Sequence, residues 1–281
     1  MTAAPEWQTR VGDIWAAEWR RTDRSFADLG RQLDAAILAL APDTGHAVDL
    51  GSGAGATSIA LAAARPGLAV HGIDLSEPLV TVARARAADR RLANLSFSVG
   101  AVPAALAGHG SIDLAVSRHG VMFFDDPIGA FHGIAAALAP GAPLVFSCFR
   151  KPQDNPWAAE TIAAIGGELS PPNGYAPGPF SLADRETITG LLAAAGFGDV
   201  SITAADYSYC AGGGPDPASD AADFFQKIGP VARAIAEAPG DRRAAMIDRL
   251  RTVLTAHIEG ERVAFPAAAW LVSARTARRA P

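Results

Sequence analysis

Apolar and polar positions alternate in a regular order over residues 46–149. Five apolar runs have the length of strands, and they lie at residues 46–50, 69–74, 95–99, 112–117 and 142–149. Alanine-rich segments of helical length separate several of them, at residues 56–65, 77–91 and 127–139. Strands that alternate with helices are typical of parallel βαβ units. The pattern therefore predicts an α/β domain with a mostly parallel sheet.

The residues before this region have a helical pattern instead. Residues 7–40 predict one or two amphipathic helices, with Trp15 and Trp19 four residues apart on one face. An apolar stripe continues from Leu29 to Leu40, and Pro42 ends the segment. We expect a helical segment over residues 1–42, in front of an α/β domain over 43–281.

The C-terminal part predicts insertions between the last strands. The first expected element is a loop around a short helix at 151–180, which is rich in proline and glycine and includes Pro171–Gly174. A helix capped at Ser181 and ending at Gly196 is expected next, followed by a strand at 198–205. The remaining expected elements are a glycine turn at 206–216, two or three helices at 218–258, and a last strand at 263–274. Residues of about 150–180 and 206–262 are expected to form a helical cap or lid.

A glycine-rich turn follows the first apolar run. Gly51, Gly53 and Gly55 lie between Leu50, which ends the run, and a helical segment that begins near Ala56. Glycine lets the backbone approach a ligand closely and accepts positive φ. This strand, turn and helix predict a site for a nucleotide-like cofactor, although a compact turn without a ligand would need the same glycines.

The second apolar run ends in an acidic residue, Asp74. A carboxylate there can accept hydrogen bonds from ribose hydroxyls; its alternative role is to cap the helix that follows. The glycine pattern, with Ala56 at the last position, also fits the looser dinucleotide motif. From these residues alone an adenosine-containing cofactor is expected, and NAD or a flavin stays open.

As a set, the motifs of this chain resemble those of the class I S-adenosylmethionine (SAM)-dependent methyltransferases, in particular small-molecule enzymes of the ubiquinone-biosynthesis type. The matching segments are Asp49–Gly55, Asp74, Phe97–Gly100, Ile112–Arg118, Gly120–Pro127, Leu138–Leu144 and Leu191–Phe197. The resemblance implies a doubly wound, Rossmann-like sheet of seven strands in the order 3-2-1-4-5-7-6, with the last strand antiparallel. It also implies that SAM lies across the carboxyl ends of strands one and four, and that S-adenosylhomocysteine is the product.

The resemblance, read together with the residues, gives a set of expected site residues. The cofactor residues are Asp49, Gly51, Ser52, Gly53, Gly55, Asp74, Leu75, Ala101, Val102 and Ser117. Asp49 is expected to hold the cofactor ammonium, or alternatively to bond the N–H groups of the loop. Relatives often have an acidic residue that reaches the adenine where this chain has Ala101 and Val102, so backbone contacts and apolar packing are expected there.

The end of the fourth strand is expected to face the methyl acceptor. His119 follows Arg118, at a place where relatives often have an aromatic ring, and it is either a general base or a substrate contact with no chemical role. Arg118 binds a carboxylate or anchors the loop. Together with Arg118, Met122, Trp15 and Trp19 are expected to cover substrate or cofactor, and the two tryptophans could equally pin a helix to the core.

Composition narrows the function classes. The chain has 281 residues, of which 49% are hydrophobic and 19% charged, and its net charge of −5 disfavours nucleic-acid binding. A cluster of arginines, Arg84, Arg86, Arg90 and Arg91, is expected to form a solvated helix face. Two cysteines without metal-ligand spacing, and no apolar run long enough for a membrane span, predict a cytoplasmic protein with no metal and no membrane partner.

The expected function is in-line transfer of a methyl group from SAM to a small, apolar organic acceptor. Two alternatives stay open at this point: an NAD-dependent oxidoreductase and a non-catalytic protein that keeps the cofactor fold. The identity of the acceptor, the atom that is methylated, and the oligomeric state are beyond the sequence.

Overall fold

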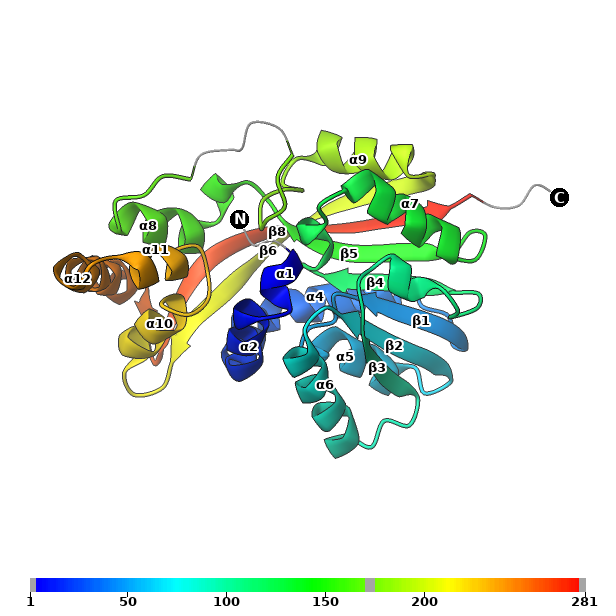
Figure 1. Cartoon of the computed structure of the whole chain (residues 1–281), viewed down its shortest axis with the longest axis horizontal. Coiled ribbons are helices and arrows are strands. Elements are labelled where there is room, and N and C mark those ends of the chain that lie inside the picture. Colours follow the sequence, from blue (N-terminus) through cyan, green and yellow to red (C-terminus); the bar gives the residue numbers. More distant parts are fainter. Residues whose placement is uncertain (1–3, 170–174, 278–281) are drawn as a thin grey trace.

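The computed structural model describes residues 4–169 and 175–277, and its centre is a twisted β-sheet (Figure 1). The strands are β1 (Gly45–Leu50), β2 (Leu68–Asp74), β3 (Leu95–Val99), β4 (Leu114–Arg118), β5 (Pro143–Phe149), β6 (Phe197–Gly213), β7 (Ile258–Glu259) and β8 (Arg262–Thr276). Each of the five apolar runs in residues 46–149 forms a strand. The expected loop residues Pro171–Gly174 lie outside the described residues.

The strand order is β3-β2-β1-β4-β5-β8-β6, and the two-residue strand β7 pairs with β8 beside this path. The strands from β3 to β5 pair in parallel, and β8 is antiparallel to both β5 and β6. With β7 set aside, this is the expected order 3-2-1-4-5-7-6 with the last strand antiparallel. The strand order reverses between β1 and β4, and open α/β sheets bind ligands at the carboxyl ends of the strands where such a reversal occurs.

Helices cover both faces of the sheet. The α-helices are α1 (Ala4–Trp7), α2 (Arg10–Ala17), α3 (Trp19–Ser25), α4 (Ala27–Leu38), α5 (Ala56–Ala64), α6 (Glu77–Asp89), α7 (Pro127–Ala137), α8 (Pro156–Ala164), α9 (Arg185–Ala194), α10 (Pro217–Phe225), α11 (Ala232–Glu237) and α12 (Gly240–Ala256), and three short 3₁₀ turns are η1 (Ala104–Leu106), η2 (Val121–Phe123) and η3 (Pro152–Asp154). Leu33 and Ile37 of α4 pack with Leu61 of α5 on one face. Phe131 of α7 and Leu192 of α9 belong to the core on the other face.

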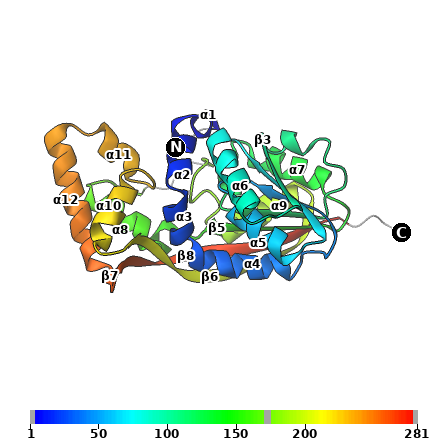
Figure 2. The same ribbon diagram turned by 90° about the horizontal axis from the view of Figure 1, so that it is seen from below.

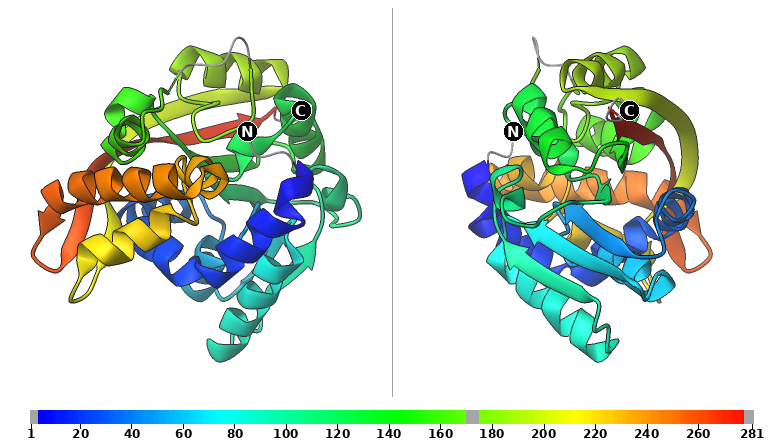
Figure 3. Two further views of the ribbon diagram at one scale, coloured as in Figure 1. Left: turned by 60° about the vertical axis from the view of Figure 1, so that its left-hand side comes forward. Right: turned by 90° about the vertical axis from the view of Figure 1, so that its right-hand side faces the viewer.

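The strands β6 and β8 are much longer than the rest and run beyond the sheet core (Figures 1 and 2). Their far ends carry a second group of helices, α8, α10, α11 and α12, which we call the cap helices (Figure 3). The expectation of a turn from residue 206 is wrong, because β6 continues to Gly213. Tyr207 and Tyr209 are buried while Asp206 and Ser208 are exposed, which is the alternation of a strand with one buried face.

The N-terminal segment is broken into four helices rather than one or two. The breaks lie at Thr9, Glu18 and Phe26, and the expected apolar stripe of α4 is buried at Leu29, Leu33 and Ile37. Helices α2 and α3 stand between the sheet core and the cap helices (Figure 2). This position brings the N-terminal helices close to the carboxyl ends of the strands.

One predicted helix cap is wrong. Asp184 caps α9, since its carboxylate accepts from Glu186 N and Thr187 N at 3.1 Å each. The Ser181 hydroxyl instead donates to the carbonyl of Met122 at 2.7 Å. Asp184 takes the cap position because a carboxylate is at least as good an acceptor for the free N–H groups of a first helical turn as a hydroxyl.

Candidate active site

The glycine turn after β1 is fixed by the end of β2. Gly51 N and Ser52 N both donate to the carbonyl of Ile73 at 2.9 Å. Gly53 N donates to Asp74 Oδ2 at 2.8 Å, and Ser76 N donates to Asp74 Oδ1 at 2.9 Å. Asp74 therefore links the turn to the start of α6. Because each carboxylate oxygen can accept more than one hydrogen bond, Asp74 keeps acceptor capacity for a ligand.

The three glycines of the turn serve different purposes. All have positive φ, of 68° at Gly51, 53° at Gly53 and 81° at Gly55. A Cβ on Gly55 would lie 2.8 Å from the Phe97 ring, and one on Gly51 would lie 3.2 Å from Gly120 Cα. A Cβ on Gly53 would meet no described atom within 4 Å. Packing thus accounts for Gly51 and Gly55, whereas Gly53 borders open space where backbone can meet a ligand.

Asp49 lies beneath this turn and is buried. The Ser58 hydroxyl donates to its Oδ2 at 2.6 Å, and its Oδ1 has no hydrogen-bond partner among the described residues. Burial raises the pKa of Asp49 to about 6, although the Ser58 hydrogen bond and Arg118 oppose the rise. The alternative that Asp49 bonds the N–H groups of the loop is wrong, because Ile73 and Asp74 accept from those groups. An unpaired, buried carboxylate oxygen is well placed for a cationic partner.

The remaining expected cofactor residues surround the same strand ends. The buried Ser52 hydroxyl lacks a partner in the described part of the chain. Ser117 donates to the Leu50 carbonyl at 2.7 Å and accepts from Gly120 N at 3.2 Å, so it ties the ends of β1 and β4 together. Leu75 follows β2, and Ala101 and Val102 follow β3; Leu75 and Val102 are half-buried and Ala101 is exposed.

The Asp74 carboxyl is nearly enclosed. Burial raises its pKa, and the hydrogen bonds from Ser76, Gly53 and Leu75 oppose that rise. The alternative that Asp74 caps α6 is wrong, because the cap is Ser76, whose hydroxyl accepts from Leu79 N at 3.3 Å. Asp74 is thus free of the helix-cap role and points to the glycine turn.

His119 occupies an unusual position at the end of β4. Its φ of 60° is left-handed, which is uncommon for a residue other than glycine. The ring stacks on Phe149 with centroids 4.1 Å apart, and neither ring nitrogen has a hydrogen-bond partner in the part of the chain that the structure describes. Burial, with a smaller effect of Arg118, lowers the pKa of His119 to about 3. The imidazole is therefore neutral at physiological pH, so it can form hydrogen bonds but is a weak base.

Arg118 anchors a neighbouring helix. Its guanidinium pairs with Asp23 Oδ1 of α3 at 3.0 Å, and Arg86 of α6 pairs with Asp23 Oδ2 at 2.6 Å. Arg86 also donates to the carbonyl of Ala54 in the glycine turn and lies over the Trp19 ring at 4.0 Å. The expectation of a solvated arginine face is wrong for Arg86, because Asp23 draws it toward the site.

The expected covering residues are placed by packing. Trp15 lies against Trp7, with ring centroids 5.4 Å apart, and Trp7 lies against Phe123. The face of Trp19 is taken by arginine, as above. Met122 is buried in the core, and only its carbonyl, which accepts from Ser181, reaches the loop before α9. The N-terminal helices are tied to the site through Asp23, whereas the Met122 side chain contributes to the core and not to a cover.

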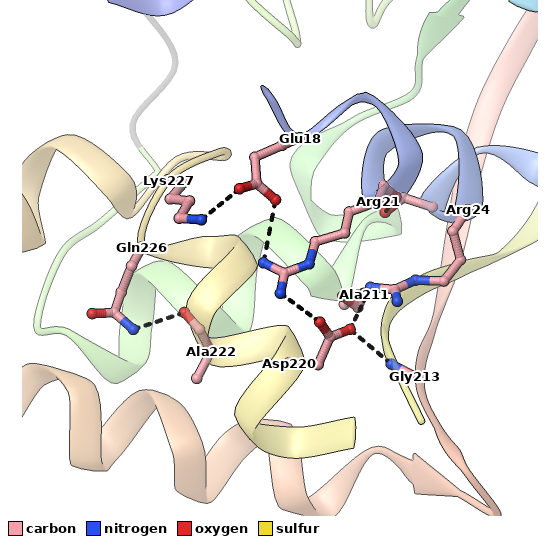
Figure 4. Close-up of polar contacts among 10 residues, drawn as sticks. Glu18, Arg21, Arg24, Ala211, Gly213, Asp220, Ala222, Gln226 and Lys227 are labelled. Atoms are coloured by element: carbon pink, nitrogen blue, oxygen red, sulfur yellow. Dashed lines mark hydrogen bonds and ion pairs between the residues drawn. The ribbon is translucent and has the colours of Figure 1, made fainter. Parts of the chain in front are cut away.

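A polar network joins the N-terminal helices to the cap helices (Figure 4). Asp220 of α10 pairs with Arg21 at 2.8 Å and with Arg24 at 2.7 Å, and Lys227 pairs with Glu18. Arg24 also donates to the Ala211 carbonyl of β6 at 2.9 Å. Helices α2 and α3 are thereby held on both sides, by Asp23 to the sheet core and by these pairs to the cap helices.

Two surface depressions lie away from this site. One of about 260 Å³ is lined by the first halves of β1, β2 and β3, far along the strands from the glycine turn. In residues 4–169 and 175–277, no group of three or more His, Cys, Asp or Glu is arranged to hold a metal ion. Within the same ranges, no helix has the length and apolar character needed to cross a bilayer.

The sheet core and the glycine turn resemble a known family. Residues 48–144 match the family model described as a methyltransferase domain. Among curated relatives, it is 33% identical over 125 residues to aklanonic acid methyltransferase DauC of Streptomyces sp. (strain C5). That match covers 43% of this chain and 55% of the relative, so it spans about half of the relative's length.

Solved structures agree on the fold. YcgJ of Bacillus subtilis superposes with a TM-score of 0.56 at 17% identity, covering 88% of this chain and 99% of that chain. Phosphoethanolamine N-methyltransferase 2 of Haemonchus contortus, solved with SAM, gives a TM-score of 0.56 at 18% identity, covering 99% of this chain and 61% of that chain. Neither the family match nor these likenesses favours the oxidoreductase alternative.

Several residues around the site were not predicted from the sequence. They are Asp23, Arg86, Phe26, Phe149, Trp157 and Tyr209. Asp23 lies among charged residues of both signs, between Glu18 and Arg24. Nothing in this segment indicates that Asp23 pairs with two distant arginines. The aromatic residues come from separate segments, and their meeting depends on the length of β6, which was underestimated.

Proposed function

We propose that the protein transfers the methyl group of SAM to a small organic acceptor. The observation that carries this proposal is the joint placement of Gly53, Asp49 and Asp74. Open space lies beside the Gly53 backbone, a carboxylate oxygen of Asp49 lacks a partner among the described residues, and Asp74 faces the same turn. These groups suit an amino-acid tail and a ribose that meet at one glycine turn.

The chain's own groups would hold SAM as follows. Asp74 accepts hydrogen bonds from the ribose hydroxyls, and Asp49 faces the ammonium of the methionine part. Ser52 bonds the carboxylate end of that part. Leu75, Ala101 and Val102 pack around the adenine, because no acidic residue follows β3 to bond its amino group. Gly51, Gly55 and Ser117 keep the turn and the strand ends in place.

SAM supplies a methyl group already activated by its sulfonium. The protein therefore mainly aligns the acceptor atom with the methyl group and the sulfur, and alignment can lower a barrier by roughly 7–11 kcal/mol. Helices α2 and α3, with the cap helices α8, α10, α11 and α12, exclude water from the glycine turn. Arg118 anchors α3 through Asp23, and Trp15 and Trp19 hold the N-terminal helices in place.

The acceptor is a small and largely apolar molecule. The relative's name says that DauC acts on aklanonic acid, a small organic molecule, and the residues around His119 are largely aromatic. His119 contacts the acceptor as a neutral imidazole. It does not need to remove a proton when the acceptor atom is already deprotonated and carries a negative charge.

Titration calorimetry with S-adenosylhomocysteine tests the proposal. We expect one site per chain with a Kd in the micromolar range, and no heat from NADH under the same conditions. Tight binding of NADH, or no binding of S-adenosylhomocysteine at hundred-micromolar concentrations, would overturn it. A second arm incubates the protein with SAM and acceptor mixtures and follows S-adenosylhomocysteine release by mass spectrometry. Cofactor binding without turnover across such panels would favour the non-catalytic alternative.

A further inference from the structure

Six ring-bearing side chains from distant segments meet around the carboxyl ends of β4 and β5. We call this set the ring wall, and its members are Phe26, His119, Phe149, Trp157, Phe180 and Tyr209. They come from the start of α4, the end of β4, the end of β5, the start of α8, the loop before α9, and β6. Five of the six are buried, and Phe180 is half-buried.

Two pairs in the ring wall are face to face. The centroids of His119 and Phe149 lie 4.1 Å apart with an interplanar angle of 11°, and those of Trp157 and Tyr209 lie 4.8 Å apart at 15°. Phe180 contacts Phe149 and Trp157 more loosely, at 5.8 and 6.3 Å. Aromatic rings that stack in this way favour contacts with other planar rings.

The wall includes one polar position whose hydrogen bonds are unmet. His119 is only 8% exposed, and within the described residues both of its ring nitrogens lack a partner. Buried polar atoms are nearly always paired, so two unpaired imidazole nitrogens call for a partner such as a water or a ligand. Its left-handed backbone, strained for a residue other than glycine, supports the same reading, because such conformations gather at functional sites.

We propose that the methyl acceptor is a planar aromatic compound with a hydroxyl group, which packs on the ring wall and is oriented by a hydrogen bond between that hydroxyl and His119. This inference rests on the proposed methyl transfer and specifies its substrate. His119 follows β4 directly, at the switch point between β1 and β4. A ring held there lies close to the glycine turn, because Gly120, the residue after His119, approaches Gly51.

Neutral imidazole matches a hydroxyl well. One ring nitrogen donates and the other accepts, and a hydroxyl can do both. A saturated acceptor of equal size would bury similar apolar area but lose the stacking contribution of aromatic pairs. Phe180 is the member that an incoming ring displaces most readily, because it is half-buried and its contacts are the loosest of the set.

The test is calorimetric binding of a matched probe pair to the protein saturated with S-adenosylhomocysteine. The probes are 2-naphthol and decahydro-2-naphthol, which share the hydroxylated bicyclic frame and differ in aromaticity. We expect 2-naphthol to bind at least roughly threefold more tightly than its saturated counterpart. Equal affinities, or tighter binding of the saturated probe, would overturn the inference.

Variants at His119 separate the hydrogen bond from the stacking. His119→Phe keeps a ring against Phe149 but removes both nitrogens, and we expect it to weaken 2-naphthol binding roughly three- to tenfold. His119→Asn keeps a donor and an acceptor and tolerates the left-handed backbone, so it is expected to retain part of the selectivity for hydroxylated probes. His132→Ala on the exposed face of α7 is the matched control and is expected to change nothing.

A further variant and a melting measurement test whether a loss of 2-naphthol binding is caused by unfolding. Phe180→Ala removes the loosest ring without touching the buried ones, so 2-naphthol binding is expected to be unchanged or tighter. If His119→Phe melts at the wild-type temperature and still binds 2-naphthol as the wild type does, the role of His119 is refuted. If S-adenosylhomocysteine binds but neither probe does, the aromatic acceptor is refuted and the proposed function stands; failure of S-adenosylhomocysteine itself refutes the proposed function.

Discussion

The two sides of the site are built by different means. On the cofactor side, a short stretch of chain from Asp49 to Ser76 closes on itself through backbone hydrogen bonds, and Asp74 joins its two ends. On the acceptor side, the ring wall gathers single residues from six segments, and packing rather than hydrogen bonding holds them. The first side depends on local geometry, and the second on the whole fold.

This difference has a consequence for variation. The glycine turn tolerates few changes, since a Cβ on Gly55 would meet Phe97 and one on Gly51 would approach Gly120. The ring wall consists of side chains that can be replaced singly without breaking a backbone hydrogen bond. We therefore expect variants on the cofactor side to change cofactor binding strongly, and variants of the ring wall to change the choice of acceptor.

Asp74→Ala gives the largest expected effect. It removes the acceptors of Gly53 N and Ser76 N together with the proposed ribose contact, and charge-assisted hydrogen bonds are worth about 1.5–3 kcal/mol each. We expect the Kd for S-adenosylhomocysteine to rise by roughly a hundredfold in calorimetry. Glu77→Ala, at an exposed neighbouring position, is the control. A Kd within threefold of wild type would mean that Asp74 only shapes the turn.

Asp49→Asn tests the unpaired oxygen in two ways. The loss of the charge that faces the ammonium should weaken S-adenosylhomocysteine binding about tenfold. The folded-state pKa of about 6 exceeds the ordinary 3.8, so the buried charge destabilises the ligand-free fold above pH 6 and not below pH 3.8. Without ligand, the variant should thus be more stable than wild type at pH 8, by up to about 3 kcal/mol.

The pH profile decides this second prediction. Denaturant unfolding of both proteins from pH 4 to pH 8 should show the advantage of Asp49→Asn growing between pH 4 and about pH 6 and levelling off above it. A constant difference across that range would contradict a buried, unpaired carboxylate. A variant less stable than wild type at pH 8 would mean that Asp49 is paired in the folded protein.

Asp23→Ala removes the carboxylate that joins α3 to Arg86 of α6 and Arg118 of β4. It leaves Arg86 and Arg118 without their shared carboxylate, and all three side chains are only partly buried, so we expect a loss of about 1–2 kcal/mol of stability. Hydrogen exchange of α2 and α3 should accelerate more than that of α5. Glu237→Ala breaks an exposed pair with Arg233 and should cost under about 0.5 kcal/mol. Unchanged exchange in α2 and α3 would show that the cap contacts alone hold these helices.

Much of the core sheet could be predicted from the sequence, because each of its strands is marked by the residues of its own segment. The strand β3 matches its predicted bounds, and the glycine turn and Asp74 follow their strands as expected. The strand β6 was cut short because Gly212 and Gly213 suggested a turn. The alternation of Tyr207 and Tyr209 with polar residues could have revealed the longer strand.

The positions of the proposed cofactor residues were predictable, and the surroundings of the proposed acceptor residues were not. Asp49, Gly53 and Asp74 lie in a motif whose spacing fixes their relation. His119 was identified as a candidate, but its stacking on Phe149 and the loss of its basicity follow from burial among rings of other segments. The pairing of Asp23 with two arginines depends on how α3 docks, which no local pattern encodes.

A crystal structure of the protein with S-adenosylhomocysteine is the most direct test of the central claim. The account predicts the ribose hydroxyls within hydrogen-bond distance of Asp74, the ammonium beside Oδ1 of Asp49, and the ligand backbone alongside Gly53. A ligand bound away from the glycine turn, or one held there with Asp49 and Asp74 turned away from it, would contradict the account.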